Sequence, residues 1–89
     1  MAVRKMYCVV TLDPSKVKLG ESYYQFSFPK DRPELFFLSK DEALNSAQET
    51  AIHHPKIPVI LMESCDLFET KRPEVIRKVF QENGDLVPK

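Results

Sequence analysis

Two adjacent histidines, His53 and His54, are the side chains of this sequence that could most directly do acid–base or metal chemistry. A histidine exchanges a proton near neutral pH, and its neutral ring nitrogen ligates metals. Neighbouring residues of a helix point about 100° apart, however, so the two rings do not readily share one metal. A cation at the end of a helix is favoured by the helix dipole. We therefore favour a capping role, and keep a minimal enzyme or toxin using His53 or His54 as the second alternative function.

A second group of candidates surrounds residues 22–28, where apolar and polar residues alternate. The alternation predicts a half-buried strand with Tyr24 in the core and Tyr23 on the opposite, exposed side. An exposed aromatic ring on a sheet can stack on a base or anchor a protein partner. Basic side chains in the following turn could meet a phosphate, and a helix N-terminus can bind an anion. The predicted ligand- or partner-binding residues are Tyr23, Gln25, Lys30, Arg32 and Ser39.

Motifs that would indicate an enzyme or a cofactor site are missing from the sequence. Gly20 and Gly84 are its only glycines, so it has no glycine-rich phosphate loop. It also lacks the G-x-S-x-G, C-x-x-C and H-E-x-x-H patterns. Cys8 and Cys65 lie 57 positions apart, which does not make a zinc site, and we expect both to be buried free thiols. We expect no catalytic residues, no metal and no cofactor.

Size and charge narrow the classes of partner. Eighty-nine residues, 43% of them hydrophobic, predict a single compact domain over residues 1–89. Thirteen basic residues balance thirteen acidic ones, which argues against a binder of nucleic acid polymers and is compatible with self-association. No apolar run, the one at residues 59–62 included, is long enough to span a membrane, and no signal peptide is recognisable. We therefore expect a cytoplasmic protein that does not bind membranes.

The elements that must position these residues are marked most clearly around Ser39. Ser39, followed three positions later by Glu42, predicts a capping box at the start of a helix. Ala43 and Ala47 belong to its apolar stripe, and Pro55 prevents its continuation. Strands are predicted on both sides of this helix and earlier in the chain, at residues 5–12, 22–28, 35–38 and 58–65. Because a helix joins the last two strands, we expect them to be parallel neighbours.

Beyond these elements, we expect a loop at residues 66–70 and a second helix that begins near Pro73 and stops at Gly84. The predicted order is therefore βββαβα. This is an α+β two-layer sandwich, in which a small mixed sheet of about four strands is covered by two helices. The residues expected to be buried together are Val10, Phe26, Phe37, Leu44, Ala47, Ile60, Val79 and Phe80.

The order of elements over residues 7–68 resembles the leading half of the ADP-ribosyltransferase-like folds. The resemblance lies in the opening strand, the run Phe36-Phe37-Leu38-Ser39, an alanine-rich helix and a following strand. The chain lacks the length and the catalytic glutamate of that family, so the resemblance assigns no role to any residue.

These observations lead to three functional hypotheses. The first is a small cytosolic protein-interaction or self-association module without catalytic activity, which docks through the exposed side of residues 22–28. The alternative is a small-ligand domain for a nucleotide, with Tyr23 stacking on the base and Lys30 or Arg32 meeting the phosphate. The histidine-based enzyme is the third.

Overall fold

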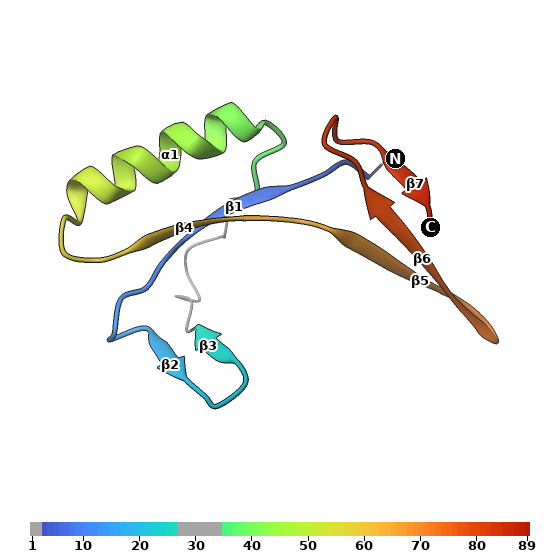
Figure 1. Ribbon diagram of the computed structural model, residues 1–89, viewed down its shortest axis with the longest axis horizontal. Helices are drawn as coiled ribbons and strands as arrows, with labels where there is room; N and C mark the ends of the chain where they lie inside the picture. Colours follow the sequence, from blue (N-terminus) through green and yellow to red (C-terminus); the bar gives the residue numbers. More distant parts are fainter. Residues whose placement is uncertain (1–2, 27–34) are drawn as a thin grey trace.

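The computed structural model describes residues 3–26 and 35–89. Its centre is an antiparallel pair of strands, β1 (Tyr7–Thr11) and β4 (Val59–Glu63), in which Val9 lies opposite Leu61. The single helix of the described residues, α1 (Lys40–His53), packs along this pair (Figure 1). Ala43 is fully buried in α1, because a small side chain lets the helix backbone approach the strands closely.

The start of α1 follows the predicted capping signal. Ser39 has extended dihedral angles (φ −114°, ψ 128°), and its hydroxyl accepts a hydrogen bond from the Glu42 amide at 3.4 Å. The backbone carbonyl of Ser39 accepts the first helical bond, from Ala43, at 3.1 Å. The predicted N-cap is confirmed.

Three further strands form a meander: β5 (Asp66–Lys71), β6 (Glu74–Phe80) and β7 (Leu86–Pro88). Arg72 and Pro73, joined by a cis peptide bond, make the tight turn between β5 and β6. Gly84, at φ +93°, makes the turn between β6 and β7. The backbone N–H of Lys5 donates to the Gly84 carbonyl at 3.0 Å, which ties the chain segment before β1 to this turn.

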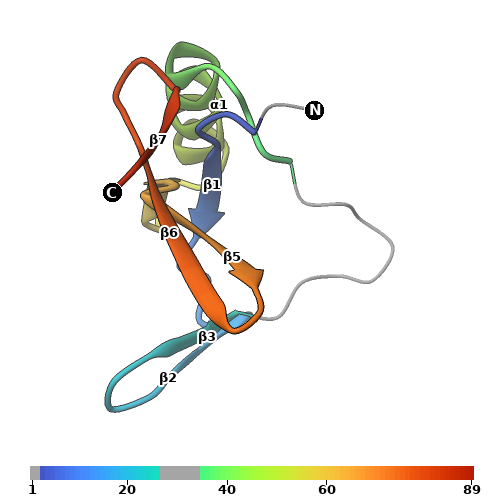
Figure 2. The same ribbon diagram turned by 90° about the vertical axis from the view of Figure 1, so that its right-hand side faces the viewer.

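A short hairpin, β2 (Val17–Leu19) and β3 (Tyr24–Phe26), forms the third antiparallel sheet. It projects from the β1–β4 pair on the side opposite α1 (Figures 1 and 2). The chain is extended as a whole, with principal dimensions of 45 × 31 × 26 Å. Its radius of gyration is 15.6 Å, whereas a compact domain of this length would have roughly 12 Å.

The predicted fold class is wrong. The described residues form three small antiparallel sheets with one helix, and not a mixed sheet covered by two helices. The predicted second helix is strand β6, and the predicted loop at residues 66–70 is its partner β5. Val75, Ile76 and Val79 are β-branched, and such side chains favour a pleated strand once a partner strand is available.

The predicted parallel pair is also wrong, because β1 lies between its two members. Phe37 exchanges two backbone hydrogen bonds with Tyr7, of 2.7 and 2.8 Å, on one edge of β1, and β4 pairs with the other edge. Phe37 and β4 each pair antiparallel with β1, on opposite edges of it. The backbone at Phe37 therefore runs in the same direction as β4, but β1 lies between them. The predicted strand at residues 35–38 is reduced to this single bridge.

The buried core is small. Among the described residues, the buried hydrophobic ones are Tyr7, Val10, Ala43 and Phe80. The predicted burial of Val10 and Phe80 is confirmed, and Phe26, Phe37, Ala47 and Val79 are half-buried. The predicted burial of Leu44 and Ile60 is wrong, since both are exposed. One helix cannot cover the faces that two were expected to cover.

Candidate functional site

The hairpin β2–β3 begins at a turn organised by Asp13. The backbone N–H and the hydroxyl of Ser15 donate to Asp13 Oδ1 at 3.0 and 2.8 Å. These two bonds, the backbone bond foremost, lower the pKa of the Asp13 carboxyl. The Asp13 carbonyl accepts from the amides of Lys16 and Val17 at 2.8 and 3.0 Å. The start of the hairpin is therefore set by a local network, as the Asp-Pro-Ser sequence favours.

One face of the hairpin is apolar and largely uncovered. Leu19 lies opposite Tyr24 and Val17 lies opposite Phe26, and all four share one face because directly opposite residues of antiparallel strands do. The exposed fractions are 69% for Leu19 and 60% for Tyr24, and the other two are half-buried. The opposite face carries polar side chains, with Lys18 opposite Gln25.

The loop between the two strands holds Tyr23 against Gly20. The Gly20 amide donates to the Tyr23 carbonyl at 2.7 Å. A Cβ atom on Gly20 would lie 3.1 Å from the Tyr23 ring, so the missing side chain makes room for the ring. Tyr23 nevertheless remains 66% exposed. The loop thus presents an exposed aromatic ring beside Gly20.

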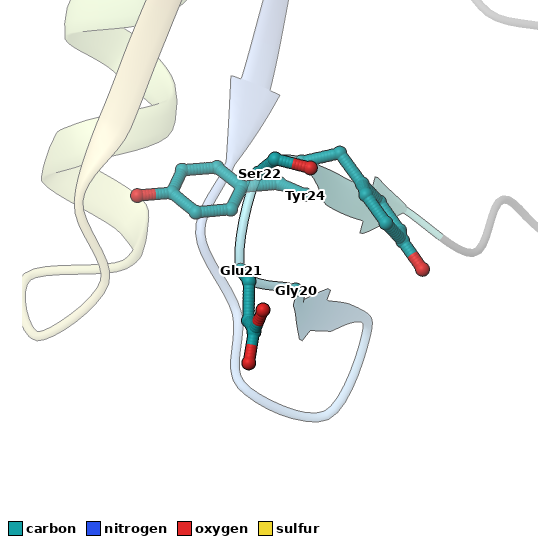
Figure 3. Close-up of a pocket in the computed structure, with 5 residues that line it drawn as sticks. Gly20, Glu21, Ser22 and Tyr24 are labelled. Carbon is teal, nitrogen blue, oxygen red and sulfur yellow. The ribbon is translucent and has the colours of Figure 1, made fainter.

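A shallow hollow of about 370 Å³ opens at this loop, lined by residues 20–24 (Figure 3). Its polar groups are the Glu21 carboxylate, the Ser22 hydroxyl and the two tyrosine phenols. The lining contains no cation. A phosphate would have to be met by residues outside it, so the hollow by itself suits an aromatic or polar surface better than an anion.

The structure separates the residues that were predicted to form the site. Tyr23 and Gln25 are exposed on the hairpin as predicted, but Tyr24 is exposed as well, which contradicts its predicted place in the core. Ser39 caps α1, on the other side of the β1–β4 pair (Figure 1). Lys30 and Arg32 lie outside the described residues.

The two histidines lie at the end of α1 and are exposed. The His54 amide donates to the Thr50 carbonyl at 3.0 Å, which closes the last turn, and His53 lies in that turn. Within residues 3–26 and 35–89, no group of three or more histidine, cysteine or acidic side chains could hold a metal ion. Cys65 is an exposed free thiol and Cys8 is half-buried, in contrast to their predicted burial.

Sequence reasoning missed a buried lysine. Lys5 is buried, and its ammonium lies 2.9 Å from Glu63 Oε2 and 5.9 Å from the centre of the Tyr7 ring. The hydrogen bond with Glu63 raises the pKa of Lys5, and the same bond lowers the pKa of Glu63, although desolvation opposes both changes. Their separation of 58 positions leaves no local signal for this pair.

Comparison with known proteins places the chain in no family, since no family, no curated protein and no solved structure matches it. The resemblance to ADP-ribosyltransferase-like folds therefore has no support beyond the order of elements. No helix among the described residues is both long and apolar enough to cross a membrane.

Proposed function

We propose that this chain is a small protein-interaction module, and that the apolar face of the β2–β3 hairpin, formed by Val17, Leu19, Tyr24 and Phe26, is its docking surface. The observation that carries the proposal is the exposure of Leu19 and Tyr24, directly opposite each other on a hairpin that projects from the rest of the chain. Contiguous apolar side chains of this kind mark interaction surfaces in folded proteins.

The stability of the hairpin supports the same conclusion. An isolated two-stranded hairpin is marginally stable in water, and it gains stability when its apolar face packs on another surface. The hairpin is hydrogen-bonded to itself, and no third strand extends it among the described residues. A partner on the apolar face would stabilise the hairpin and bury Leu19 and Tyr24 in one step.

Each side chain of the hairpin has a role in this proposal. Leu19 and Tyr24 are the apolar anchors, whereas Lys18 and Gln25 lie on the opposite, polar face. The proposed docking surface therefore differs from the one expected from the sequence, which included Gln25. Tyr23, in the loop beside them, adds an exposed aromatic ring that a partner could contact.

The rest of the surface supports self-association as one form of this interaction. Among the described residues, 14 large hydrophobic side chains are exposed, whereas four hydrophobic residues are buried. A net charge of zero removes long-range repulsion between copies.

We place the module in the cytoplasm. Cys65 is an exposed free thiol, which suits a reducing compartment. Fractionation of cells that express the tagged chain tests this placement, and recovery in an oxidising or membrane fraction would contradict it.

The docking surface is tested with two matched double variants. Leu19→Ser with Tyr24→Ser removes the anchors, and Lys18→Ser with Gln25→Ser changes two side chains of the same strands on the other face. We expect the first pair to abolish partner capture and the second to leave it intact, with circular dichroism showing that both fold.

The nucleotide alternative is tested in parallel by NMR titration with a panel of nucleotides. Saturable shifts clustered at the hairpin, in a chain that stays monomeric and captures no protein, would refute the interaction proposal. The same result would favour the small-ligand hypothesis. Partner capture that survives the loss of Leu19 and Tyr24 would move the docking surface away from the hairpin.

A further inference from the structure

The outer edge of β4 is free among the described residues. The Leu12 amide donates to the Pro58 carbonyl, and the Ser64 amide donates to the Met6 carbonyl, both at 2.9 Å. Hydrogen bonding alternates along an antiparallel ladder, so the even-numbered residues of this stretch bond to β1. The backbone groups of Val59, Leu61 and Glu63 therefore point away from β1, and within residues 3–26 and 35–89 β4 pairs with no strand other than β1.

This free edge has defined ends. Pro58, which has no amide hydrogen, precedes it. At the other end β4 continues directly into β5 (Figure 1), and β6 occupies the same edge from Cys65 onward, where the Phe80 amide donates to the Cys65 carbonyl at 2.8 Å. The opening between these limits is five residues long, which is the length of β4 itself.

The edge lacks the devices that usually prevent strands from pairing between molecules. Those devices include charged side chains, prolines within the strand and bulges. Glu63 is the only charged residue of β4, and its carboxylate is already bound by Lys5 of the same chain at 2.9 Å. The remaining residues of β4 are apolar.

We propose that β4 pairs antiparallel with β4 of a second copy of this chain, across a two-fold axis at Leu61. The inference deepens the self-association part of the proposed function and rests on it. Leu61 would face Leu61 of the second copy, Ile60 would face Met62, and Val59 would face Glu63. The two chains would share a four-stranded sheet in the order β1-β4-β4-β1, with both helices on one face because opposite residues of antiparallel strands share a face.

The register is self-complementary in hydrogen bonding, in shape and in charge. The outward-pointing backbone groups of Val59, Leu61 and Glu63 meet their equivalents, and no like charges lie opposite each other. Ile60 and Met62, which are 37% and 50% exposed, meet across the axis and cover each other.

The chain as a whole exposes more surface than a compact folded monomer of its mass. Its accessible surface is 7532 Å². A folded monomer of 10.3 kDa would expose roughly 5400 Å², so the chain has about 2100 Å² in excess. A second copy is the occupant that the neutral net charge and the self-complementary register favour.

Cysteine cross-linking tests the register in the full chain carrying Cys65→Ser. Leu61→Cys would place two thiols on the axis, where the Cα atoms of a hydrogen-bonded pair lie about 5.5 Å apart, within reach of a disulfide. Val59→Cys is the matched control, because it also lies on the free edge but would be four residues out of register with itself, at roughly 13 Å. We expect mild oxidation to give a covalent dimer with Leu61→Cys and none with Val59→Cys or the parent.

A charge pair tests the same register without cross-linking. Ile60→Glu with Met62→Glu would oppose like charges across the axis, whereas Ile60→Glu with Met62→Lys would oppose unlike charges at the same two positions. Sedimentation velocity should show the first variant as a monomer and the second as a dimer, with circular dichroism reporting that both fold.

The outcomes separate this inference from the proposed function. Equal cross-linking at positions 59 and 61, or a dimer that persists with two glutamates, would overturn the β4 interface while leaving self-association through another surface. A wild-type chain that stays monomeric at every concentration would also overturn it. The hairpin proposal would then still be decided by its own capture assay with the Leu19 and Tyr24 variants.

Discussion

Replacing Gly84 with alanine should weaken the whole β5–β6–β7 meander, because this glycine makes the turn between β6 and β7. The Gln81 amide donates to the Asp85 carbonyl at 2.8 Å, and the Gly84 amide donates to the Gln81 carbonyl at 2.9 Å. The resulting three-residue loop needs a residue with positive φ, and Gly84 has φ +93°. A side chain at this position is strained in any surroundings.

The magnitude follows from two contributions. A non-glycine residue at positive φ costs about 1–2 kcal/mol. A Cβ atom would also lie 2.7 Å from Arg4 Nη2, which donates to the Asn83 carbonyl at 2.9 Å, and the neighbouring Nη1 contacts Asp85 at 3.1 Å. Arg4 and Asp85 are about half exposed, so displacing the guanidinium costs up to about 1 kcal/mol. We expect a total near 2 kcal/mol, in the range that backbone strain usually covers.

Urea denaturation followed by far-UV circular dichroism measures this loss, and tyrosine fluorescence provides a second probe in a chain without tryptophan. Each kcal/mol should also lower the Tm by about 4–8 °C in a domain of this size. Arg4→Ala in combination with Gly84→Ala separates the contributions, since it relieves the contact but not the φ strain. Gly84→Asn should be less harmful than Gly84→Ala, because asparagine tolerates positive φ better. A Gly84→Ala midpoint equal to that of wild type would refute the turn as described.

Three further predictions concern the cap, the core and the buried ion pair. Ser39→Ala should lower the free energy of unfolding by about 0.5–1 kcal/mol, at the low end for an N-cap because the hydrogen bond that is lost is 3.4 Å long. The shift of the urea midpoint measures this loss, and an unchanged midpoint would show that Ser39 does not stabilise the helix as a cap. Phe80→Ala should cost about 3–5 kcal/mol because Phe80 is 7% exposed, and the matched Phe68→Ala, at an exposed position, should cost far less; equal losses would contradict the assigned core. The lowered pKa of Glu63 means that its ion pair stabilises the fold above the ordinary glutamate range and is lost as the pH falls through the lowered pKa. Because the pKa of Lys5 is raised, the stabilisation from the ion pair is also lost as the pH rises through that pKa. Lys5→Met should therefore flatten both the acid and the alkaline limb of the curve of stability against pH, and an unchanged curve would argue against the ion pair.

Features that depend on neighbouring residues were predictable from the sequence. Ser39 and Glu42 mark the start of α1 within four positions, and Asp13 organises its turn through bonds to Ser15, two residues away. Tyr23 is exposed as predicted, but the alternation behind that prediction also placed Tyr24 in the core, which is wrong, and Tyr23 lies in the loop before β3. Gly84 was recognised as a stop signal, but it lies in the turn between two strands and not at the end of a helix.

The second half of the chain shows where a local pattern has two solutions. Val75, Ile76, Val79 and Phe80 are spaced as on one face of a helix, yet they lie in β6. The choice is made by β5, which supplies a complete set of hydrogen-bonding partners from Asp66 to Lys71. The spacing of residues in one segment shows which structures that segment favours. It does not show whether another segment is available to pair with it as a strand.

Burial was the property that only the tertiary structure decided. The sequence by itself determined that residues 59–62 belong to an apolar strand and that Ser39 caps the start of α1. It could not determine whether a second layer would cover the apolar faces, because covering depends on contacts between distant segments. The structure leaves Tyr24, Ile60 and Met62 exposed, since one helix covers only one face of one strand pair. The candidate interaction surfaces of this protein arise from that uncovered apolar area.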